Sequence, residues 1–338
     1  MQTCPCYQAP AKNSTPPLFV RVMHCKFGQR PYSTKPPPPC AHLGQLKLLV
    51  SEIEFLTPFY GRSLRVVYAG AAPGIHMPIL AQMFPTMHFV MVDPMRSMIS
   101  NGEYGNIEVI QDLMTDALAA EYGGSLFISD VRVGPGSSEE SGVEQQCRIQ
   151  ADMEAQQRWV RIMRPLSSIL KFRLPWSISK KTEYLSGKIY FPVYGKQLTH
   201  EARLIVPRDA LPRVYDNQRY ERQMAYFNRV LRPAVFGGLC YDCTAFRSIV
   251  GAYLAVAGVE GSEVDKRCVK IERELERLKR QWFHYCEHSV ASTTSSCKSP
   301  CEPDSCRQQS SVQPAEACSG ASDGSCPSSL HRQSSQPV

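Results

Sequence analysis

The middle of the chain alternates between short apolar runs and longer amphipathic segments. A short apolar run bounded by Gly, Pro or polar residues predicts a buried strand, whereas apolar residues repeated every three or four positions predict a helix. The predicted strands cover residues 64–70, 88–93, 107–111, 125–131, 167–174 and 201–206. Strands that alternate with helices predict an α/β fold, with a mostly parallel sheet and helices on both faces.

Two of the predicted helices have a well-defined apolar stripe. In residues 44–57 the stripe consists of Leu46, Leu49, Val50, Ile53 and Leu56. A second helix is expected to start at Ser262, with Asp265 as the acid of a capping box. Its stripe consists of Val264, Cys268, Ile271, Leu275, Leu278 and Trp282. The other faces of this helix are crowded with Arg, Lys and Glu, which suits either a solvated surface helix or a helix that binds a partner. Further helices are predicted at residues 76–84, near Asp116, and at 143–163 and 217–231.

The two ends of the chain differ from the middle. Residues 1–40 are rich in proline and end in the run Pro36 to Pro39, which cannot enter a helix or a central strand. We therefore expect an arm with little structure of its own. Residues 288–338 are rich in Ser, Cys and Gln and lack aromatic residues, which predicts a disordered tail. Residues 41–287 are then expected to form a single domain.

The composition is ordinary for a globular protein, with 43% hydrophobic and 20% charged residues. No apolar run is long enough to span a membrane, and the N-terminus lacks the apolar core of a secretory signal. The formal net charge of +7 is compatible with an anionic partner such as RNA. We expect the fourteen cysteines to be free thiols in a reducing compartment. No metal site is expected, because the C-x-x-C pair Cys240 and Cys243 has no second pair nearby.

The stretch VVYAGAAPG, residues 66–74, is the most informative part of the sequence. It indicates a strand, a glycine loop and then a helix, the unit that lines the ligand crevice of open α/β sheets. The spacing of Gly70 and Gly74 is not G-x-G-x-x-G, so S-adenosylmethionine fits better than a dinucleotide, although an ordinary strand-to-helix turn would look similar. Asp93 ends the next strand, where an acid typically accepts from a ribose hydroxyl or caps a helix.

Four charged residues interrupt apolar segments. Asp130, Lys171 and Glu201 lie in or at the ends of predicted strands, and Lys47 lies in the apolar helix GQLKLLV. A buried charge is costly unless it is paired or has a function. Each residue alone could belong to a structural ion pair. Together they have the Lys-Asp-Lys-Glu order of RNA 2′-O-methyltransferases.

Several motifs make the resemblance more specific, namely GQLKLL, VVYAGAAPGIH, ISDVR, SSILKFRLPW, EARL and YERQMAYFN. From about residue 43 to 245 the chain resembles the poxvirus cap-specific mRNA 2′-O-methyltransferase family, whose members also serve as the small regulatory subunit of the viral poly(A) polymerase. The resemblance implies a Rossmann-like, S-adenosylmethionine-dependent methyltransferase fold. It also implies two partners, capped mRNA and the catalytic polymerase subunit, and a location in the virion and the host cytoplasm.

The resemblance assigns roles to individual residues. The implied catalytic tetrad is Lys47, Asp130, Lys171 and Glu201. The implied cofactor-binding residues are Gln45, Tyr68, Gly70, Gly74, Asp93, Met95 and Met114. The implied cap-binding residues are Arg173, Trp176 and Glu221. Three departures stand out: Met95 replaces an arginine of the family, the loop between Lys196 and Glu201 is shorter, and Leu198 falls where the family has a second stacking aromatic.

The physical chemistry of these residue types agrees with the implied roles. Lys171 can be the general base only if its pKa is lowered, and neighbouring cations such as Lys47 would lower it. The positive charge of 7-methylguanine suits an aromatic face, here Trp176, and a nearby carboxylate, here Glu221. Two alternatives stay open, namely a 2′-O-methyltransferase for another RNA and a non-catalytic RNA-binding subunit of the polymerase.

Overall fold

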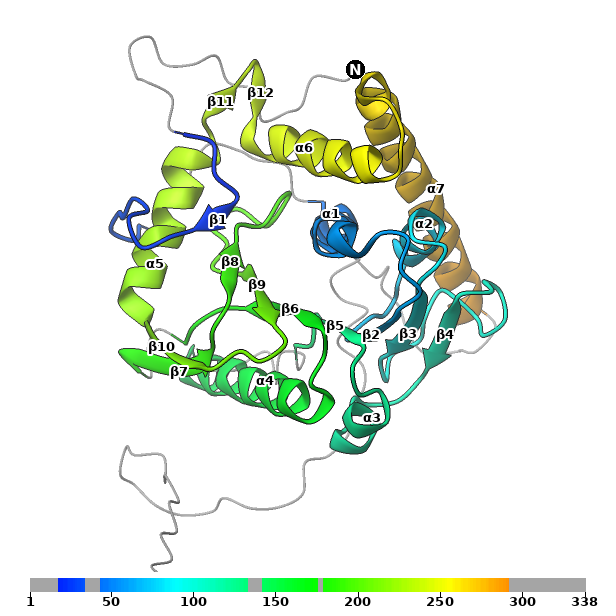
Figure 1. Ribbon diagram of the computed structural model, residues 1–338, viewed down its shortest axis with the longest axis horizontal. Helices are drawn as coiled ribbons and strands as arrows, with labels where there is room; N and C mark the ends of the chain where they lie inside the picture. The colour runs from blue at the N-terminus through cyan, green and yellow to red at the C-terminus, as the bar shows by residue number, and fades with distance from the viewer. Residues whose placement is uncertain (1–17, 34–42, 133–141, 176–178, 292–338) are drawn as a thin grey trace, which may run out of the picture. The chain divides into compact units, whose positions relative to one another are not determined.

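The computed structural model describes residues 18–33, 43–132, 142–175 and 179–291, and an eight-stranded sheet forms its centre (Figure 1). The strand order is β1-β8-β9-β6-β5-β2-β3-β4. The strands are β1 (Val22–Met23), β2 (Arg65–Ala69), β3 (His88–Val92), β4 (Ile107–Ile110), β5 (Leu126–Ser129), β6 (Ser167–Phe172), β8 (Lys188–Tyr190) and β9 (Ala202–Pro207). The five strands from β4 to β6 are parallel, whereas β9, β8 and β1 run antiparallel to their neighbours. The predicted strands are thus confirmed, with slightly different ends.

Helices cover both faces of the sheet, as expected. Figure 1 shows α1, α2, α6 and α7 over one face and α3 and α4 over the other, with α5 beside the antiparallel end of the sheet. The helices are α1 (Gly44–Leu56), α2 (Met77–Met83), α3 (Asp116–Glu121), α4 (Gly142–Met163), α5 (Asn217–Tyr226), α6 (Tyr241–Val256) and α7 (Val264–Ala291). Smaller elements are β7 (Lys181–Leu185) paired with β10 (Pro212–Asp216), β11 (Val235–Phe236) paired with β12 (Leu239–Cys240), and the short helices η1 (Thr57–Phe59), η2 (Phe227–Leu231) and η3 (Gly261–Glu263).

The apolar stripes predicted for α1 and α7 face the core. In α1 all five stripe residues are fully buried, and in α7 the stripe packs against α1, α2 and α6. Because parallel strands end at the same edge of a sheet, the segments that follow β2, β3 and β5 meet there. This edge brings together the glycine loop, Asp93 and Asp130.

The expectation of an arm with little structure is wrong for residues 18–33. Val22 and Met23 form β1, which pairs with β8 and so covers its open edge. The ring of Phe27 is buried and packs 4.8 Å from that of Phe191, centroid to centroid. The disordered tail predicted from residue 288 is wrong for residues 288–291, because α7 continues to Ala291. Residues 1–17 and 34–40, and the tail from 292 onward, lie outside the described residues.

Two helix ends also differ from expectation. The helix predicted over 217–231 is α-helical only to Tyr226, and its last turn widens into the π-helical η2. The capping box predicted at Ser262 is wrong, since that residue lies in η3 and α7 begins at Val264. The carboxylate of Asp265 pairs instead with Arg247 of α6. No helix in the described parts of the chain is both long and apolar enough to cross a membrane.

Candidate active site

The structure brings the four charged residues of the predicted tetrad together at one edge of the sheet. The amine of Lys171, on β6, lies 3.4 Å from Oδ1 of Asp130, which follows β5. It lies 3.8 Å from Oε2 of Glu201, which immediately precedes β9. The amine of Lys47, on α1, donates to Oε1 of Glu201 at 2.8 Å. Four elements far apart in sequence therefore place two amines against two carboxylates.

A fifth charge completes this cluster. Nη1 of Arg203, on β9, lies 2.7 Å from Oδ1 of Asp130, and its Nη2 lies 3.7 Å from Oε1 of Glu201. Its side chain is buried. Counting Lys47 and Lys171, the cluster holds three basic groups and two acidic groups, so with every group ionised it has an excess of one positive charge.

The environment of Lys171 favours loss of a proton from its amine, which would remove the excess positive charge of the cluster. The side chain is only 6% exposed, and burial lowers the pKa of its amine to about 8. Asp130 and Glu201 oppose this shift, because their negative charges favour the charged amine. Arg132 and Lys47 reinforce it. About a tenth of the amine is therefore neutral at pH 7, far more than for a lysine of ordinary pKa.

The two carboxylates stay ionised. Burial by itself would raise the pKa of Asp130, but the charges of Lys171 and Arg203 hold it well below its usual value. Burial would likewise raise the pKa of Glu201, but Lys47 and Lys171 hold it well below its usual value. Both carboxylates can therefore accept hydrogen bonds across the neutral pH range.

The glycine loop lies directly against this cluster. Gly70 has a φ of 79°, and a Cβ at this position would lie 2.8 Å from the backbone nitrogen of Val131 and 2.9 Å from the carbonyl carbon of Asp130. The lack of a side chain at Gly70 therefore allows close packing of the loop on Asp130, in addition to any approach of a ligand. Gly74 also has a positive φ, 71°, which disfavours other residues there.

Asp93 holds the glycine loop in place. Its Oδ2 accepts from the backbone nitrogen of Ala72 at 3.0 Å, and its Oδ1 accepts from that of Met95 at 2.8 Å. No helix begins at Asp93, so the alternative of a helix cap is wrong.

A buried hydrogen-bond network supports the loop from below. Glu52 of α1 is 2% exposed and accepts from the hydroxyl of Tyr68 at 2.7 Å, and its other oxygen lies 2.9 Å from Nε2 of His76. The opposite ring nitrogen of His76 lies 2.8 Å from Oε1 of Gln45. Tyr68 is only 1% exposed, so its side chain is buried beneath the loop and does not contact solvent. The amide nitrogen of Gln45 remains available to a ligand as a donor.

The remaining predicted cofactor residues lie in the loops at this edge. Met114 is buried just before α3, and Met95 is half-buried after β3. Arg96, beside Met95, turns away and packs its guanidinium 4.6 Å from the ring centre of Tyr285 on α7. Arg96 therefore does not take the place of the arginine that the family has at the position of Met95.

The predicted cap residues are brought together less completely. Arg173 follows β6 and is half-buried, and burial, followed by the charge of Arg132, lowers the pKa of its guanidinium. Glu221 is half-buried on α5, where burial raises the pKa of its carboxyl. This carboxyl makes no hydrogen bond or ion pair within the described part of the chain. Trp176 lies outside the described residues.

Two rings that the sequence analysis did not single out lie near Arg173. The rings of Tyr32 and His200 are 5.2 Å apart, and both residues interact electrostatically with Arg173. Burial and the charge of Arg173 lower the pKa of His200 to about 4, so its ring is neutral at pH 7. Leu198 is half-buried with a φ of 57°. Within the described residues, Tyr32 and His200 thus supply two aromatic rings near Arg173.

Comparison with known proteins establishes the family. A family model described as the poly A polymerase regulatory subunit matches residues 29–262, more than half of the chain. The chain belongs to this family. Its curated relatives include the cap-specific mRNA (nucleoside-2′-O-)-methyltransferases of the Lausanne and Uriarra strains of Myxoma virus, each 24% identical over 226 residues. The match covers 60% of this chain and 65% of each relative, so the chain spans slightly less than two thirds of these relatives.

Similarity to solved structures is weaker. A putative ribosomal RNA methyltransferase from Plasmodium falciparum aligns with 48% of this chain and 95% of its own, at 11% identity and a TM-score of 0.32. An antibiotic-related methyltransferase aligns with 53% of this chain and 96% of its own, at 10% identity and a TM-score of 0.24. Scores this low do not by themselves establish a shared fold.

In this member of the regulatory-subunit family, three parts of the site were not predicted from the sequence. Arg203 stands two residues after Glu201, so both side chains project from the same face of the strand, and this spacing could have revealed it. Arg132 stands two residues after Asp130 in the motif ISDVR. No comparable signal links Glu52 to the glycine loop, since that contact exists only once α1 packs on the sheet.

Proposed function

We propose that this chain methylates the ribose 2′-hydroxyl of the first transcribed nucleotide of capped mRNA. The observation that carries the proposal is the buried Lys171 amine, held by Asp130 and Glu201 beside the glycine loop. A ribose hydroxyl is a weak nucleophile at neutral pH, and a positioned base of matched pKa accelerates its reaction. The names of the curated relatives support the same activity.

The residues at the sheet edge suit S-adenosylmethionine, which when bound supplies an electrophilic methyl group. Asp93, which ends β3 and contacts the backbone of the glycine loop, is the residue we assign to the ribose hydroxyls. Gln45 can donate from its amide to the carboxylate of the amino acid part. We further assign cofactor contacts to Gly70, Gly74, Met95 and Met114. Tyr68, being buried, supports these contacts rather than making them.

In the proposed reaction, neutral Lys171 accepts the proton of the 2′-hydroxyl at Nζ as the methyl group is transferred. Asp130 and Glu201 orient the amine and stabilise it once it is charged. Lys47 and Arg203 keep these two carboxylates ionised and in place. Arg132 and Arg173 add positive charge at the same edge, where phosphate groups of the RNA would pass.

For the cap, we propose that the positively charged 7-methylguanine stacks on an aromatic face and meets a carboxylate. Trp176, Glu221 and Arg173 are the residues that we assign to the cap. Glu221→Ala is expected to reduce the preference for 7-methylguanosine over guanosine caps, and Trp176→Ala to cost about 1–3 kcal/mol of stacking. Equal affinities of both variants and the wild type for a cap analogue would place the cap elsewhere.

One assay tests the proposal most directly. Labelled methyl transfer from S-adenosylmethionine is measured on RNA with a cap lacking 2′-O-methylation, and on the same RNA without a cap. We expect transfer only to the capped RNA, at the first nucleotide, and none with Lys171→Ala, whereas the surface variant Lys188→Ala should match the wild type. Equal transfer to both RNAs would favour a 2′-O-methyltransferase for another RNA, and no transfer would favour a non-catalytic subunit.

We also propose a second role, as the regulatory subunit of a poly(A) polymerase, which the family description supports. This role should not depend on the methyl-transfer site. The wild type and Lys171→Ala should both lengthen poly(A) tails when added to the catalytic subunit. If the wild type does not stimulate that subunit, this role is excluded.

A further inference from the structure

The long helix α7 has a basic face that the proposed chemistry does not use. Its buried face holds the apolar stripe of Cys268, Ile271, Leu275 and Leu278. Successive residues of an α-helix are rotated by about 100°, which places every residue on a definite face. The face directly opposite the buried stripe carries Lys266, Lys270, Arg273, Arg277 and Arg280, which we call the basic stripe.

The basic stripe contains no acidic residue. Glu272 and Glu276 fall on one flank of the helix and Glu274 on the other, so the centre of the exposed face is positive from Lys266 to Arg280. The five cations are spaced by three or four residues, so each lies next to another of the same charge. Like charges at these spacings weaken a helix by roughly 0.2–0.5 kcal/mol per pair. A helix that only had to be solvated would mix its charges, so the stripe suits an anionic partner better.

Most of this charge is available to a partner. Lys270, Arg273 and Arg280 are exposed and form no ion pair within the described residues. Lys266 pairs with Glu263 at 2.8 Å and Arg277 with Glu274 at 2.6 Å, but both pairs are exposed, and such pairs exchange at little cost.

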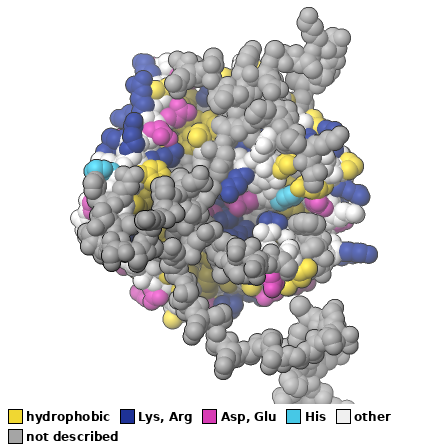
Figure 2. Space-filling view, turned by 180° about the vertical axis from the view of Figure 1, so that it is seen from behind, with side chains coloured by type: hydrophobic (Ala, Val, Ile, Leu, Met, Phe, Trp, Pro, Cys, Tyr) yellow, Lys and Arg dark blue, Asp and Glu magenta, His cyan; other side chains and the backbone are white. Residues whose placement is uncertain are grey.

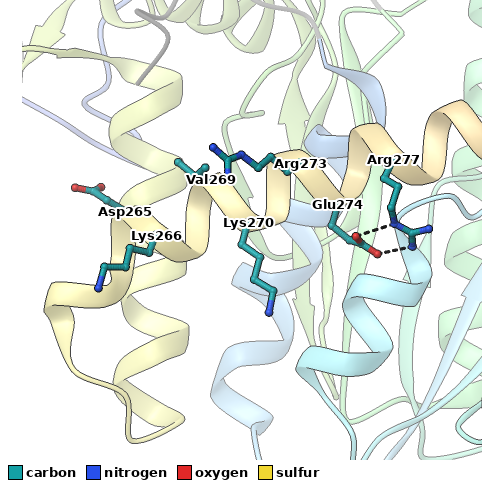
Figure 3. A pocket seen from close by; sticks show the side chains of 7 residues that line it. All are labelled: Asp265, Lys266, Val269, Lys270, Arg273, Glu274 and Arg277. Carbon is teal, nitrogen blue, oxygen red and sulfur yellow. Dashed lines mark hydrogen bonds and ion pairs between the residues drawn. The ribbon is translucent and has the colours of Figure 1, made fainter.

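Two views show how the stripe is presented. Figure 2 shows a column of Lys and Arg side chains at the upper left, over the position of α7. Figure 3 shows a groove lined by seven residues of α7, in which Lys266, Lys270, Arg273 and Arg277 leave the helix along its length. In the same groove Glu274 turns toward Arg277.

We propose that the basic stripe binds the phosphate backbone of RNA, outside the methyl-transfer site. Fourteen residues separate Lys266 from Arg280, which in an α-helix is about 21 Å and spans several consecutive phosphates. A line of evenly spaced cations matches a regular line of phosphates, and no base-reading group is needed. The inference rests on the proposed function, in which RNA is the substrate.

The stripe also has a defined relation to the active site. Its helix packs against α1, which carries Lys47, and against α2, which follows the glycine loop. Near its end, Tyr285 contacts Arg96 in the loop after β3, at the edge of the sheet where the cofactor residues lie. RNA bound along α7 would therefore lead to the edge of the sheet that holds the proposed active site. The phosphates bound by α7 would belong to nucleotides other than the one that is methylated.

The test compares two triple variants of the full-length protein. K270A/R273A/R280A removes the three unpaired cations of the stripe. R161A/K188A/R208A removes three exposed cations that form no ion pair with any described residue, from α4, from β8 and from the position just after β9, and is the matched control. Binding to a labelled, uncapped uridine oligomer of about 30 nucleotides is followed by fluorescence anisotropy over a range of salt concentrations. Circular dichroism verifies that both variants fold.

The salt dependence separates the outcomes. Each lost phosphate contact should lower the slope of log affinity against log salt by about 0.7, so the stripe variant should lose about 2 and bind at least about tenfold more weakly at low salt. The control should keep the wild-type slope. Unchanged affinity and slope in the stripe variant would overturn the proposal. A variant that still binds RNA but no longer binds the polymerase subunit would also overturn it, because the stripe would then bind a protein.

Failure of the proposed function would look different. Methyl transfer by the wild type to a short capped RNA reports on the active site alone. If the wild type binds RNA through the stripe but transfers no methyl group, the stripe stands and the proposed enzymatic function falls.

Discussion

Lys171 and Arg203 lie directly opposite each other on the antiparallel strands β6 and β9. Two positive charges at a cross-strand pair would normally repel and weaken a sheet. Here Oδ1 of Asp130 lies near both, 2.7 Å from Nη1 of Arg203 and 3.4 Å from the amine of Lys171. Arg203 therefore shares this carboxylate with Lys171, and its own positive charge disfavours protonation of the nearby amine.

The first prediction concerns the pH dependence of methyl transfer. Lys171 must be neutral to accept a proton, so the rate should rise with pH and level off above its pKa of about 8. Arg203→Met leaves the two carboxylates to pair with Lys47 and Lys171 alone. This favours the charged form of the Lys171 amine, so the midpoint of the pH–rate profile should move to higher pH. The pH–rate profile under single-turnover conditions measures this. An unchanged midpoint would contradict the argument, and Arg208→Met, at the exposed end of the same strand, is the control.

A second prediction separates a base from a structural ion pair at Lys171. A guanidinium stays protonated, so Lys171→Arg should lose about 10²–10⁴-fold in rate while it still binds cofactor and RNA. Transfer assays and calorimetry measure the two properties. Near-wild-type methyl transfer by the arginine variant would show that Lys171 has a structural role and is not the base.

A third prediction tests why a glycine is needed at position 70. Gly70→Ala strains the backbone and also pushes a methyl group against Asp130 and Val131. Gly61 has a similar φ of 77° with open space around it, so Gly61→Ala strains the backbone alone. Both variants should lose comparable stability from backbone strain, about 1–3 kcal/mol, but only Gly70→Ala should also lose methyl transfer. Equal activity in the two variants would show that the contact with Asp130 does not matter.

A fourth prediction concerns Asp93. Asp93→Ala removes the acceptor for two backbone nitrogens of the loop as well as the proposed ribose contact. Affinity for S-adenosylmethionine should fall by about 1–3 kcal/mol, or roughly tenfold to a hundredfold. Calorimetry on a variant shown to be folded checks this, and wild-type affinity would refute it.

A fifth prediction concerns the buried network. Glu52→Ala leaves the hydroxyl of Tyr68 and the ring of His76 without their buried partner, which should cost about 2–4 kcal/mol of unfolding free energy. Urea unfolding measures the loss, with the exposed Glu121→Ala as control. A loss no greater than that of the control would mean that water replaces the carboxylate.

Some of the site was predictable because it depends on local order. The glycine loop follows from a strand, two glycines and a helix in sequence, and parallel strands must end at one edge. The charges Asp130, Lys171 and Glu201 were recognisable because each interrupts an apolar strand. For Arg203 the local signal was only its spacing of two residues from Glu201, because its partner Asp130 follows β5, which is separated from β9 by β6 in the sheet.

The sequence by itself determined the alternating strands and helices, the amphipathic stripes of α1 and α7, and the residue types at the sheet edge, because periodicity and turn chemistry are local properties of the chain. Only the tertiary structure decided that residues 18–33 add a strand to the sheet and that Arg203 shares Asp130 with Lys171. It also decided that Glu52 and His76 lie beneath the loop. These contacts join segments far apart in sequence, and their energies depend on burial and distance, which no local pattern encodes.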